Sequence, residues 1–428
     1  MLNLILILTG KLLSFISVYL NLGNGSTWPG HIALNINPDF AGEILKKSKT
    51  KIILITGTNG KTTTAKILES ILEKDGKRVL TNKSGANLLN GIASSLIMEA
   101  GANGKVNKDY AIFETDESAL SEVASRLTPD FLIALDLFRD QLDRYGEVDT
   151  IYKNWKSIYS DLKGKTKFIL NGDDPRIAYL GMETDVDAKY FGLDEPAFKT
   201  NIPQYAADSS ICPRCSHTLE FKPLYFSHIG VWECPSCGLK RPRISLNKSP
   251  SYPLEGIYNI YNTLASVLTA QELGVEKEAI EKGLIDFKPA FGRQEELNID
   301  NRKVKLFLSK NPTGFNESLR TINSLKAGYL LIVLNDRIPD GRDISWIWDI
   351  DFENLLKTKT TINLAGDRVY DMALRLKYAG LKTLNFEDLD EAINNVLEKV
   401  SEGETLYILP TYSAMLEVRK ILTGKKIL

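Results

Sequence analysis

A short glycine-rich segment between a predicted strand and a predicted helix constrains this chain more than any other feature. The stretch ILITGTNGKTTTAKILESIL runs from Ile53 to Leu72, with apolar residues before the loop and an amphipathic pattern after it. A loop in that place points backbone N–H groups at an anion, and glycines allow the tight turn. We therefore predict an ATP-binding loop made of Gly57, Thr58, Asn59, Gly60, Lys61, Thr62 and Thr63.

The chemistry of such loops assigns roles to two of these residues. Lys61 is expected to reach the β- and γ-phosphates, and Thr62 to bind Mg²⁺. Only two residues separate the glycines, where the standard motif has four. The alternative is a glycine-rich turn with no ligand, and the order of strand, loop, Lys-Thr and helix argues against it.

A second magnesium ligand is expected where the apolar run YAIFET ends. Mg²⁺ takes oxygen ligands and usually one or two carboxylates, so Glu114 is the first choice. Asp116 and Glu117 follow it directly. The alternative is that these acids cap the next helix.

Four cysteines are the only ones in the chain, and their spacing predicts a metal site. Two Cys-x-x-Cys pairs are separated by eighteen residues: Cys212, Cys215, Cys234 and Cys237. Four thiolates fill a tetrahedral zinc site and leave no open position, which favours a structural role over a catalytic one. Free thiols are the alternative.

The strand and helix pattern predicts an α/β fold with a parallel sheet in a P-loop ATPase domain. We expect an N-terminal helix and linker over residues 1–50, with the turn-rich stretch 23–31 as the linker. The ATPase domain is expected over 51–292, interrupted by a zinc ribbon at 208–242. A Rossmann-like α/β domain is expected over 293–428.

Charge and hydropathy narrow the location and the partners. The net charge of −1 argues against a general nucleic-acid binder. The first residues are apolar, but Lys11 in the middle disfavours a membrane span, and a signal peptide would need a charged start. We expect this helix to pack on the protein or lie against the inner membrane surface. The few cysteines fit a cytoplasmic protein.

The motifs resemble those of the Mur ligase family, which includes folylpolyglutamate synthases. GTNGKTTT is the family's form of the loop, and GIYNIYNTLAS (256–266) resembles its adenine-contacting helix start. FGRQE (291–295) is similar to the hinge before the C-terminal domain. The resemblance implies that ATP contacts Asn259, Asn262 and Arg293, and that ATP and Mg²⁺ are used.

Departures from the family pattern point to one branch of it. The four-cysteine insertion, LSKNPTGFN (308–316) and DGRDISWIWDIDFE (340–353) are similar to the ligase-like subunits of lipid II isoglutaminyl synthases. Other Mur ligases have a His where this chain has Gln141. The resemblance implies amidation of the D-glutamate α-carboxylate in the lipid II stem peptide, through an acyl phosphate. A GatD-like glutamine amidotransferase would supply ammonia in a heterodimer.

The same resemblance implies a catalytic role for Asp349, which would orient the histidine of the partner's glutaminase site. Asp340, Asp343 and Asp351 are nearby rivals, and a helix cap is the alternative role. Trp346 and Trp348 are expected either at the partner surface or in the core. The residue that binds the substrate carboxylate is left open, with these candidates: Asn87, Arg139 and Lys310.

Two other functions remain as alternatives. An amino-acid-adding Mur or folylpolyglutamate-type ligase should keep the Asp-His and Asp-Tyr-Ala-His features that this chain lacks. A zinc-ribbon ATPase that binds nucleic acid should carry a basic surface with interleaved aromatic residues.

Overall fold

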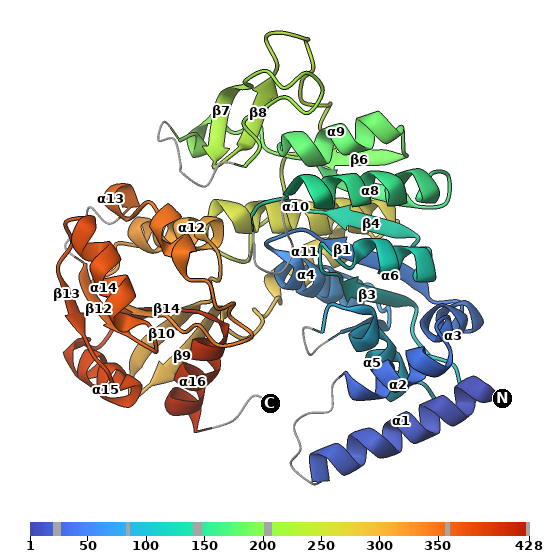
Figure 1. Ribbon diagram of the computed structural model, residues 1–428, viewed down its shortest axis with the longest axis horizontal. Helices are drawn as coiled ribbons and strands as arrows, with labels where there is room; N and C mark the ends of the chain where they lie inside the picture. Colours follow the sequence, from blue (N-terminus) through green and yellow to red (C-terminus); the bar gives the residue numbers. More distant parts are fainter. Residues whose placement is uncertain (20–26, 83–85, 140–147, 201–207, 356–359, 425–428) are drawn as a thin grey trace.

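The chain is described by a computed structural model over residues 1–19, 27–82, 86–139, 148–200, 208–355 and 360–424. These residues form two six-stranded sheets and a separate two-stranded hairpin. Figure 1 shows the first sheet in blue to green with helices in blue to yellow, the hairpin above it, and the second sheet in orange and red. Gln141 lies outside the described residues.

The first sheet is parallel, as predicted, in the order β2-β3-β1-β4-β5-β6. Its apolar strands are buried on both faces, which is typical of a parallel sheet covered by helices. The prediction missed β2 and β6, because runs of three and four residues carry little periodicity. The strands are β1 Lys51–Thr56, β2 Val79–Thr81, β3 Tyr110–Glu114, β4 Phe131–Ala134, β5 Lys167–Asn171 and β6 Ala188–Phe191.

Helices cover both faces of this sheet and enclose two cores. One core includes Ile67 of α4, Leu264 of α10 and Ile280 of α11. The other includes Ile92 of α5 and Trp155 of α8, together with N-terminal residues. The helices are α4 Lys61–Lys74, α5 Leu89–Glu99, α6 Leu120–Leu127, α8 Val148–Leu162, α9 Pro175–Thr184, α10 Ile257–Glu272 and α11 Lys277–Ile285, with the 3₁₀ turn η1 Pro196–Phe198.

The N-terminal region contains α1 Leu2–Tyr19, α2 Trp28–Ile36 and α3 Phe40–Ser48. The prediction of a turn-rich linker was wrong for residues 28–31, because Pro29 stands in the first turn of α2, where a proline needs no N–H partner. The α1 helix packs on the protein, with Leu6 and Ile7 buried in the core that includes Ile92 and Trp155. Among the described helices, none is both long enough and apolar enough to cross a membrane.

The second sheet has the order β13-β12-β11-β14-β10-β9, and only β9 is antiparallel to its neighbour. Five parallel strands confirm the Rossmann-like prediction. The hairpin of β9 and β10 was missed. The strands are β9 Arg293–Ile299, β10 Arg302–Phe307, β11 Tyr329–Val333, β12 Thr361–Ala365, β13 Thr383–Asn385 and β14 Thr405–Pro410. The helices are α12 Pro312–Ser324, α13 Phe352–Leu355, α14 Val369–Tyr378, α15 Leu389–Lys399 and α16 Tyr412–Thr423, with η2 Ser345–Asp349.

The hairpin of β7 Glu220–Phe226 and β8 Ile229–Glu233 belongs to the segment inserted between β6 and α10. Trp232 and Leu239 pack in a small core with Ala178 of α9. Arg320 of α12 donates a hydrogen bond to the Tyr225 carbonyl of β7 (3.0 Å), so the C-terminal unit also contacts the hairpin. We propose a boundary between the ATPase domain and the C-terminal domain at residues 292 and 293, because β9 of the second sheet begins at Arg293.

Candidate nucleotide, metal and partner sites

A cavity of about 400 Å³ lies where the carboxyl ends of strands from both sheets meet. Residues that follow β1, β3, β4 and β10 line it, as expected for a ligand site in an open α/β sheet. The structure brings nearly all predicted nucleotide and magnesium residues to this cavity: Thr58, Asn59, Gly60, Lys61, Thr62, Thr63, Glu114, Asn259, Asn262 and Arg293.

Two glycines shape the loop between β1 and α4. Gly57 and Gly60 have φ of 132° and 87°, which side chains rarely adopt. A Cβ added to Gly60 would lie 2.1 Å from Asn262 Oδ1. Glycine is therefore required at this position both by conformation and by space, and the loop is held against α10.

Lys61 and Thr62 begin α4 and face acidic groups. Lys61 Nζ contacts the carbonyl of Gly57 and forms an ion pair of 2.9 Å with Glu117. Thr62 Oγ1 donates a hydrogen bond of 2.6 Å to Glu114 Oε2, which joins the two predicted magnesium ligands. Burial raises the pKa of Glu114, and the bond from Thr62 opposes that shift. The hydroxyl and carboxylate oxygens suit Mg²⁺.

The acids after β3 do not cap the next helix. Asp116 Oδ1 instead accepts a hydrogen bond from the Ser118 N–H (3.0 Å), and Ala119 stands at the N-terminus of α6 with no side-chain cap. Glu117 is held by its ion pair with Lys61. The helix-cap alternative is therefore wrong for these residues.

Asp136, after β4, is a cavity residue that the sequence analysis did not select. Its Oδ1 accepts the Asn59 N–H (2.8 Å), and its carbonyl accepts the Thr58 N–H (3.2 Å). Burial raises the pKa of Asp136 to about 8, against the effect of the Asn59 bond and of the Lys61 charge. Its one signal in the sequence is a polar residue directly after an apolar strand.

Asn259 and Asn262 lie in the first turns of α10 and are almost fully buried. Asn262 Nδ2 donates to Asn259 Oδ1 (3.1 Å), and Thr64 Oγ1 donates to Asn262 Oδ1 (3.3 Å). These bonds join the start of α10 to α4. Arg293 is partly buried near Glu114, and burial lowers the pKa of its guanidinium.

The C-terminal unit closes the other side of the cavity through the start of α12. Asn311 caps this helix by accepting the Gly314 N–H (2.8 Å), and its Nδ2 donates to Asn59 Oδ1 of the phosphate loop (3.0 Å). Lys310 and Asn87 both line the cavity and stay candidates for the substrate carboxylate. Sequence reasoning missed Asn311, because its contact with the loop spans 252 positions.

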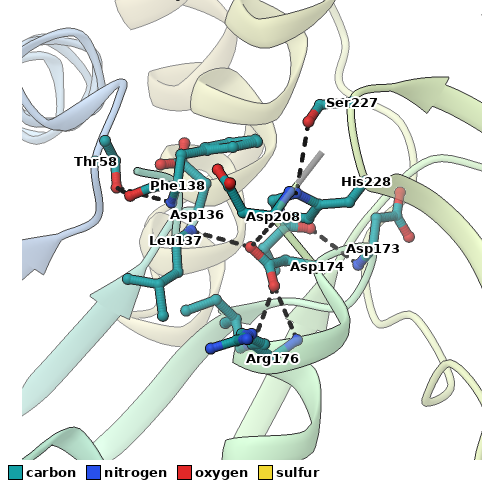
Figure 2. A network of polar contacts seen from close by, with 12 residues as sticks. Thr58, Asp136, Leu137, Phe138, Asp173, Asp174, Arg176, Asp208, Ser227 and His228 are labelled. Carbon is teal, nitrogen blue, oxygen red and sulfur yellow. Dashed lines mark hydrogen bonds and ion pairs between the residues drawn. The ribbon is translucent and has the colours of Figure 1, made fainter. Parts of the chain in front are cut away.

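The four cysteines gather at one point, although they come from two distant pairs. Their sulfur atoms all lie within 4.8 Å of one another, with 3.7 Å between Cys212 and Cys237 and 3.5 Å between Cys215 and Cys234. A zinc ion bonded to four sulfurs at about 2.3 Å would separate them by about 3.8 Å. The donor set and the spacing therefore fit zinc. His228 is buried elsewhere, in the contacts of Figure 2.

Asp349 ends η2, and its side chain is 43% exposed. The three rival carboxylates accept hydrogen bonds from residues of the C-terminal unit. Asp340 accepts the Ser413 N–H (2.7 Å), Asp343 the Ser345 N–H (2.8 Å), and Asp351 the Asn316 amide (3.0 Å).

The two tryptophans of the same segment separate into different environments. Trp346 packs on Phe315 in the C-terminal core, with ring centroids 5.8 Å apart. Trp348 is 47% exposed and lies beside Tyr378. Only Trp348 is therefore available to a partner.

Removing one thiolate should release the metal and loosen the ribbon. We expect Cys212→Ser to reduce the bound zinc from one per chain and to raise limited proteolysis within 208–242 by about tenfold, because the local core is small. Metal content by mass spectrometry and cleavage rates check this. Ser236→Ala, in the second knuckle, is the control. Fully reduced wild-type protein that binds no zinc would contradict the assignment.

Asp136→Asn should stabilise the protein increasingly as pH rises. In the unfolded chain the Asp136 carboxyl ionises near its ordinary pKa, whereas in the folded protein its pKa is about 8. As pH rises between these two values, ionisation favours the unfolded chain, so the stability of the wild type falls. We expect the Tm advantage of the variant to grow by about 3 °C from pH 5 to pH 8 and then level off. Asp185→Asn is the control, because Lys163 lowers the pKa of Asp185. A difference independent of pH would refute the expectation.

Comparisons with known proteins agree with this geometry. A model of the Mur ligase middle domain matches residues 55–270, and a model of the MurT ligase C-terminal region matches residues 308–415. The chain is 33% identical to the lipid II isoglutaminyl synthase (glutamine-hydrolyzing) subunit MurT of Streptococcus pneumoniae, over 95% of this chain and 94% of the relative. The MurT subunit of Staphylococcus aureus is 32% identical over 83% of each chain.

Solved structures show the same fold at lower identity. A pseudomurein peptide ligase type C from Methanothermus fervidus has a TM-score of 0.67 and 24% identity, over 89% of this chain and 80% of that one. MurF ligase from Thermotoga maritima in complex with ADP has a TM-score of 0.64 and 14% identity, over 91% and 83%. With these matches along nearly the whole sequence, the chain belongs to the MurT group of the Mur ligase family.

Proposed function

We propose that this protein is the ligase subunit of a lipid II isoglutaminyl synthase. It uses ATP to convert the α-carboxylate of D-glutamate in the lipid II stem peptide into the amide of D-isoglutamine. The observation that carries the proposal is the similarity to MurT subunits over 95% of the chain. The match of the MurT C-terminal model to residues 308–415 supports the choice of this branch over other Mur ligases.

The chemistry needs activation because a carboxylate is a poor electrophile. A carboxylate oxygen attacks the γ-phosphorus of ATP, the bond to ADP breaks, and an acyl phosphate forms. Ammonia then attacks the carbonyl carbon, phosphate leaves with the electron pair of the C–O bond, and nitrogen loses a proton. The protein's part is to position the groups and to stabilise charge on the transferred phosphoryl group.

The cavity contains the groups that this reaction requires. The N-terminus of α4 would face the phosphates, and Lys61 would supply a cation there. Mg²⁺, which Mur ligases use with ATP, would be held by Thr62 and Glu114 and would offset phosphate charge. Asn259, Asn262 and Arg293 are proposed to contact the nucleotide.

The nitrogen donor is proposed to be a GatD-like glutamine amidotransferase bound as the second subunit of a heterodimer. Free ammonia is mostly protonated at neutral pH and is then not a nucleophile, so production within a complex avoids this loss. Asp349 would orient the catalytic histidine of that partner, as the third member of a Cys-His-Asp arrangement. Its exposure supports this role, because the partner can reach it.

An aromatic surface beside Asp349 is proposed to bind the same partner. Trp348 and Tyr378 contact each other with ring centroids 5.6 Å apart, and they are 47% and 73% exposed. Leu374 and Tyr370 on α14 extend this surface. Exposed aromatic anchors around a functional residue are typical of protein interfaces.

The two alternative functions are less well supported. The S. pneumoniae relative carries the MurT name and aligns over 95% of this chain, whereas a UDP-N-acetylmuramoylalanine–D-glutamate ligase is 23% identical over 85%. The four cysteines support a structural ribbon that packs on α9, and this accounts for them without nucleic acid.

We also propose that the protein works in the cytoplasm at the inner face of the membrane, where a lipid-linked substrate is embedded. One face of α1 carries a continuous apolar stripe that is about half exposed or more: Leu2, Ile5, Leu8, Leu12, Phe15 and Tyr19. Figure 1 shows α1 along the edge of the molecule. Aromatic side chains such as Phe15 and Tyr19 suit the interfacial region of a bilayer.

Asp349→Asn tests the partner assignment in the co-expressed heterodimer. We expect glutamine-dependent amidation of lipid II to fall by about a thousandfold, because the partner histidine loses its orienting carboxylate, while amidation with added ammonium persists. Product formation by mass spectrometry measures both. Asp343→Asn, an exposed neighbour, is the control. A wild-type heterodimer that consumes no ATP with lipid II and glutamine would refute the proposed function itself.

Phe15→Glu tests the membrane contact. We expect binding to vesicles of phosphatidylglycerol and phosphatidylcholine to weaken by at least about tenfold, because burying a Phe side chain contributes about 1.5–3 kcal/mol. Co-sedimentation measures the partition coefficient. Ile285→Glu is the control, because Ile285 is 75% exposed but lies on α11 and not on α1. Equal vesicle binding by wild type and Phe15→Glu would exclude the α1 contact.

A further inference from the structure

The segment 135–138 after β4 forms one wall of the ATP cavity and is hydrogen-bonded to the phosphate loop. Leu135 and Phe138 line the cavity. The Phe138 N–H donates to Thr58 Oγ1 (3.0 Å), and the Thr58 hydroxyl lies 3.1 Å from the Phe138 carbonyl (Figure 2). Any displacement of this segment is therefore transmitted to Thr58.

The inserted hairpin holds the opposite side of this segment. The Leu137 N–H donates to Asp174 Oδ2 (3.0 Å), and His228 Nε2 lies 3.4 Å from the same oxygen. His228 Nδ1 accepts the Asp208 N–H (3.2 Å), so Nε2 carries the proton and donates to Asp174. The His228 ring packs on Phe138 at 4.4 Å between centroids. Figure 2 shows these groups converging at the hairpin tip.

The inserted segment also contacts Arg139, the residue that follows this wall. The Asp208 carboxylate accepts the Arg139 N–H (2.9 Å) and pairs with Arg139 Nε (2.5 Å). The Asp208 side chain is only 8% exposed, whereas the Arg139 side chain is 40% exposed. The other end of the guanidinium reaches the C-terminal domain, with Nη2 3.9 Å from Asp349 Oδ2.

We propose that Arg139 is a positioning residue for Asp349, and that the ribbon insertion holds Arg139 in place through Asp208. The inference rests on the proposed function, because Asp349 is the residue that would complete the partner's glutaminase site. A planar guanidinium suits this position, since it can pair with one carboxylate through Nε and with a second through Nη.

The arrangement would link the two half-reactions. Asp349 belongs to the C-terminal domain, and Arg139 directly follows Phe138 of the cavity wall, so their contact exists only when the two domains are close together. Glutamine hydrolysis would then be favoured in the closed arrangement, in which an acyl phosphate is shielded from water. Ammonia would be produced where it can be used.

The test compares nitrogen donors in the heterodimer with the partner glutaminase. For Arg139→Gln we expect the ratio of glutamine-dependent to ammonium-dependent amidation rates to fall by about tenfold, which corresponds to ~1.4 kcal/mol. The KM for ATP should change by less than about twofold. Arg126→Gln is the matched control, because Arg126 is also an ion-paired arginine (2.6 Å to Asp39) with 41% exposure.

Two further variants separate positioning from loss of folding. Asp208→Asn should lower the same ratio, and the double variant should be no worse than either single one, because both act through one contact. Arg139→Lys keeps a cation beside Asp208 but cannot bridge both carboxylates, so it should recover only part of the ratio. Its retained charge provides a folded variant if Arg139→Gln is unstable.

Several outcomes would overturn the inference. They are an Arg139→Gln ratio equal to that of Arg126→Gln, an equal loss with both nitrogen donors, or an increased ratio, which would mean that Arg139 restrains Asp349. The failure of the proposed function is distinguishable, because the wild-type heterodimer would then consume no ATP with lipid II and glutamine. Intact glutamine use in Asp349→Asn would refute the role of Asp349 alone.

Discussion

The close approach of the Gly60 backbone to the Asn262 side chain is the contact on which the rest of the site depends. No Cβ fits between them, so the loop lies directly against α10. A second close contact holds α4, the helix that follows the loop. A Cβ on Gly283 of α11 would lie 2.5 Å from Ile71 Cα of α4. The helix that carries Lys61 and Thr62 is thus fixed by two glycines on neighbouring elements, and the positions of both side chains follow from it.

The four-cysteine cluster would stabilise the segment inserted between β6 and α10, which lies outside the two large sheets. Four thiolates would fix the far end of the insertion, while the hairpin tip packs beside the ATP cavity through His228. A small core of Trp232, Leu239 and Ala178 joins the insertion to α9. A metal ion held by four thiolates would therefore support the wall of the proposed catalytic centre without taking part in the chemistry.

Features carried by neighbouring residues could be predicted from the sequence, whereas those made by distant residues could not. The loop and the cysteine pairs have fixed spacing, and each implies its chemistry. The hairpin of β9 and β10 could have been predicted from the Asp300-Asn301 pair between its strands. Both residues take positive φ in a two-residue turn, a conformation that Asp and Asn tolerate well. The contact of Arg139 with Asp349 could not, since it joins residues 210 positions apart through tertiary packing alone.

The bond between Asn59 and Asn311 has a consequence for turnover. One partner belongs to the phosphate loop and the other caps the first helix of the C-terminal domain. Separating the domains must break this bond, so such a motion would alter the surroundings of the phosphate loop. In the proposed reaction, release of ADP through such a separation would tie the pace of the catalytic cycle to a rigid-body motion as well as to bond making.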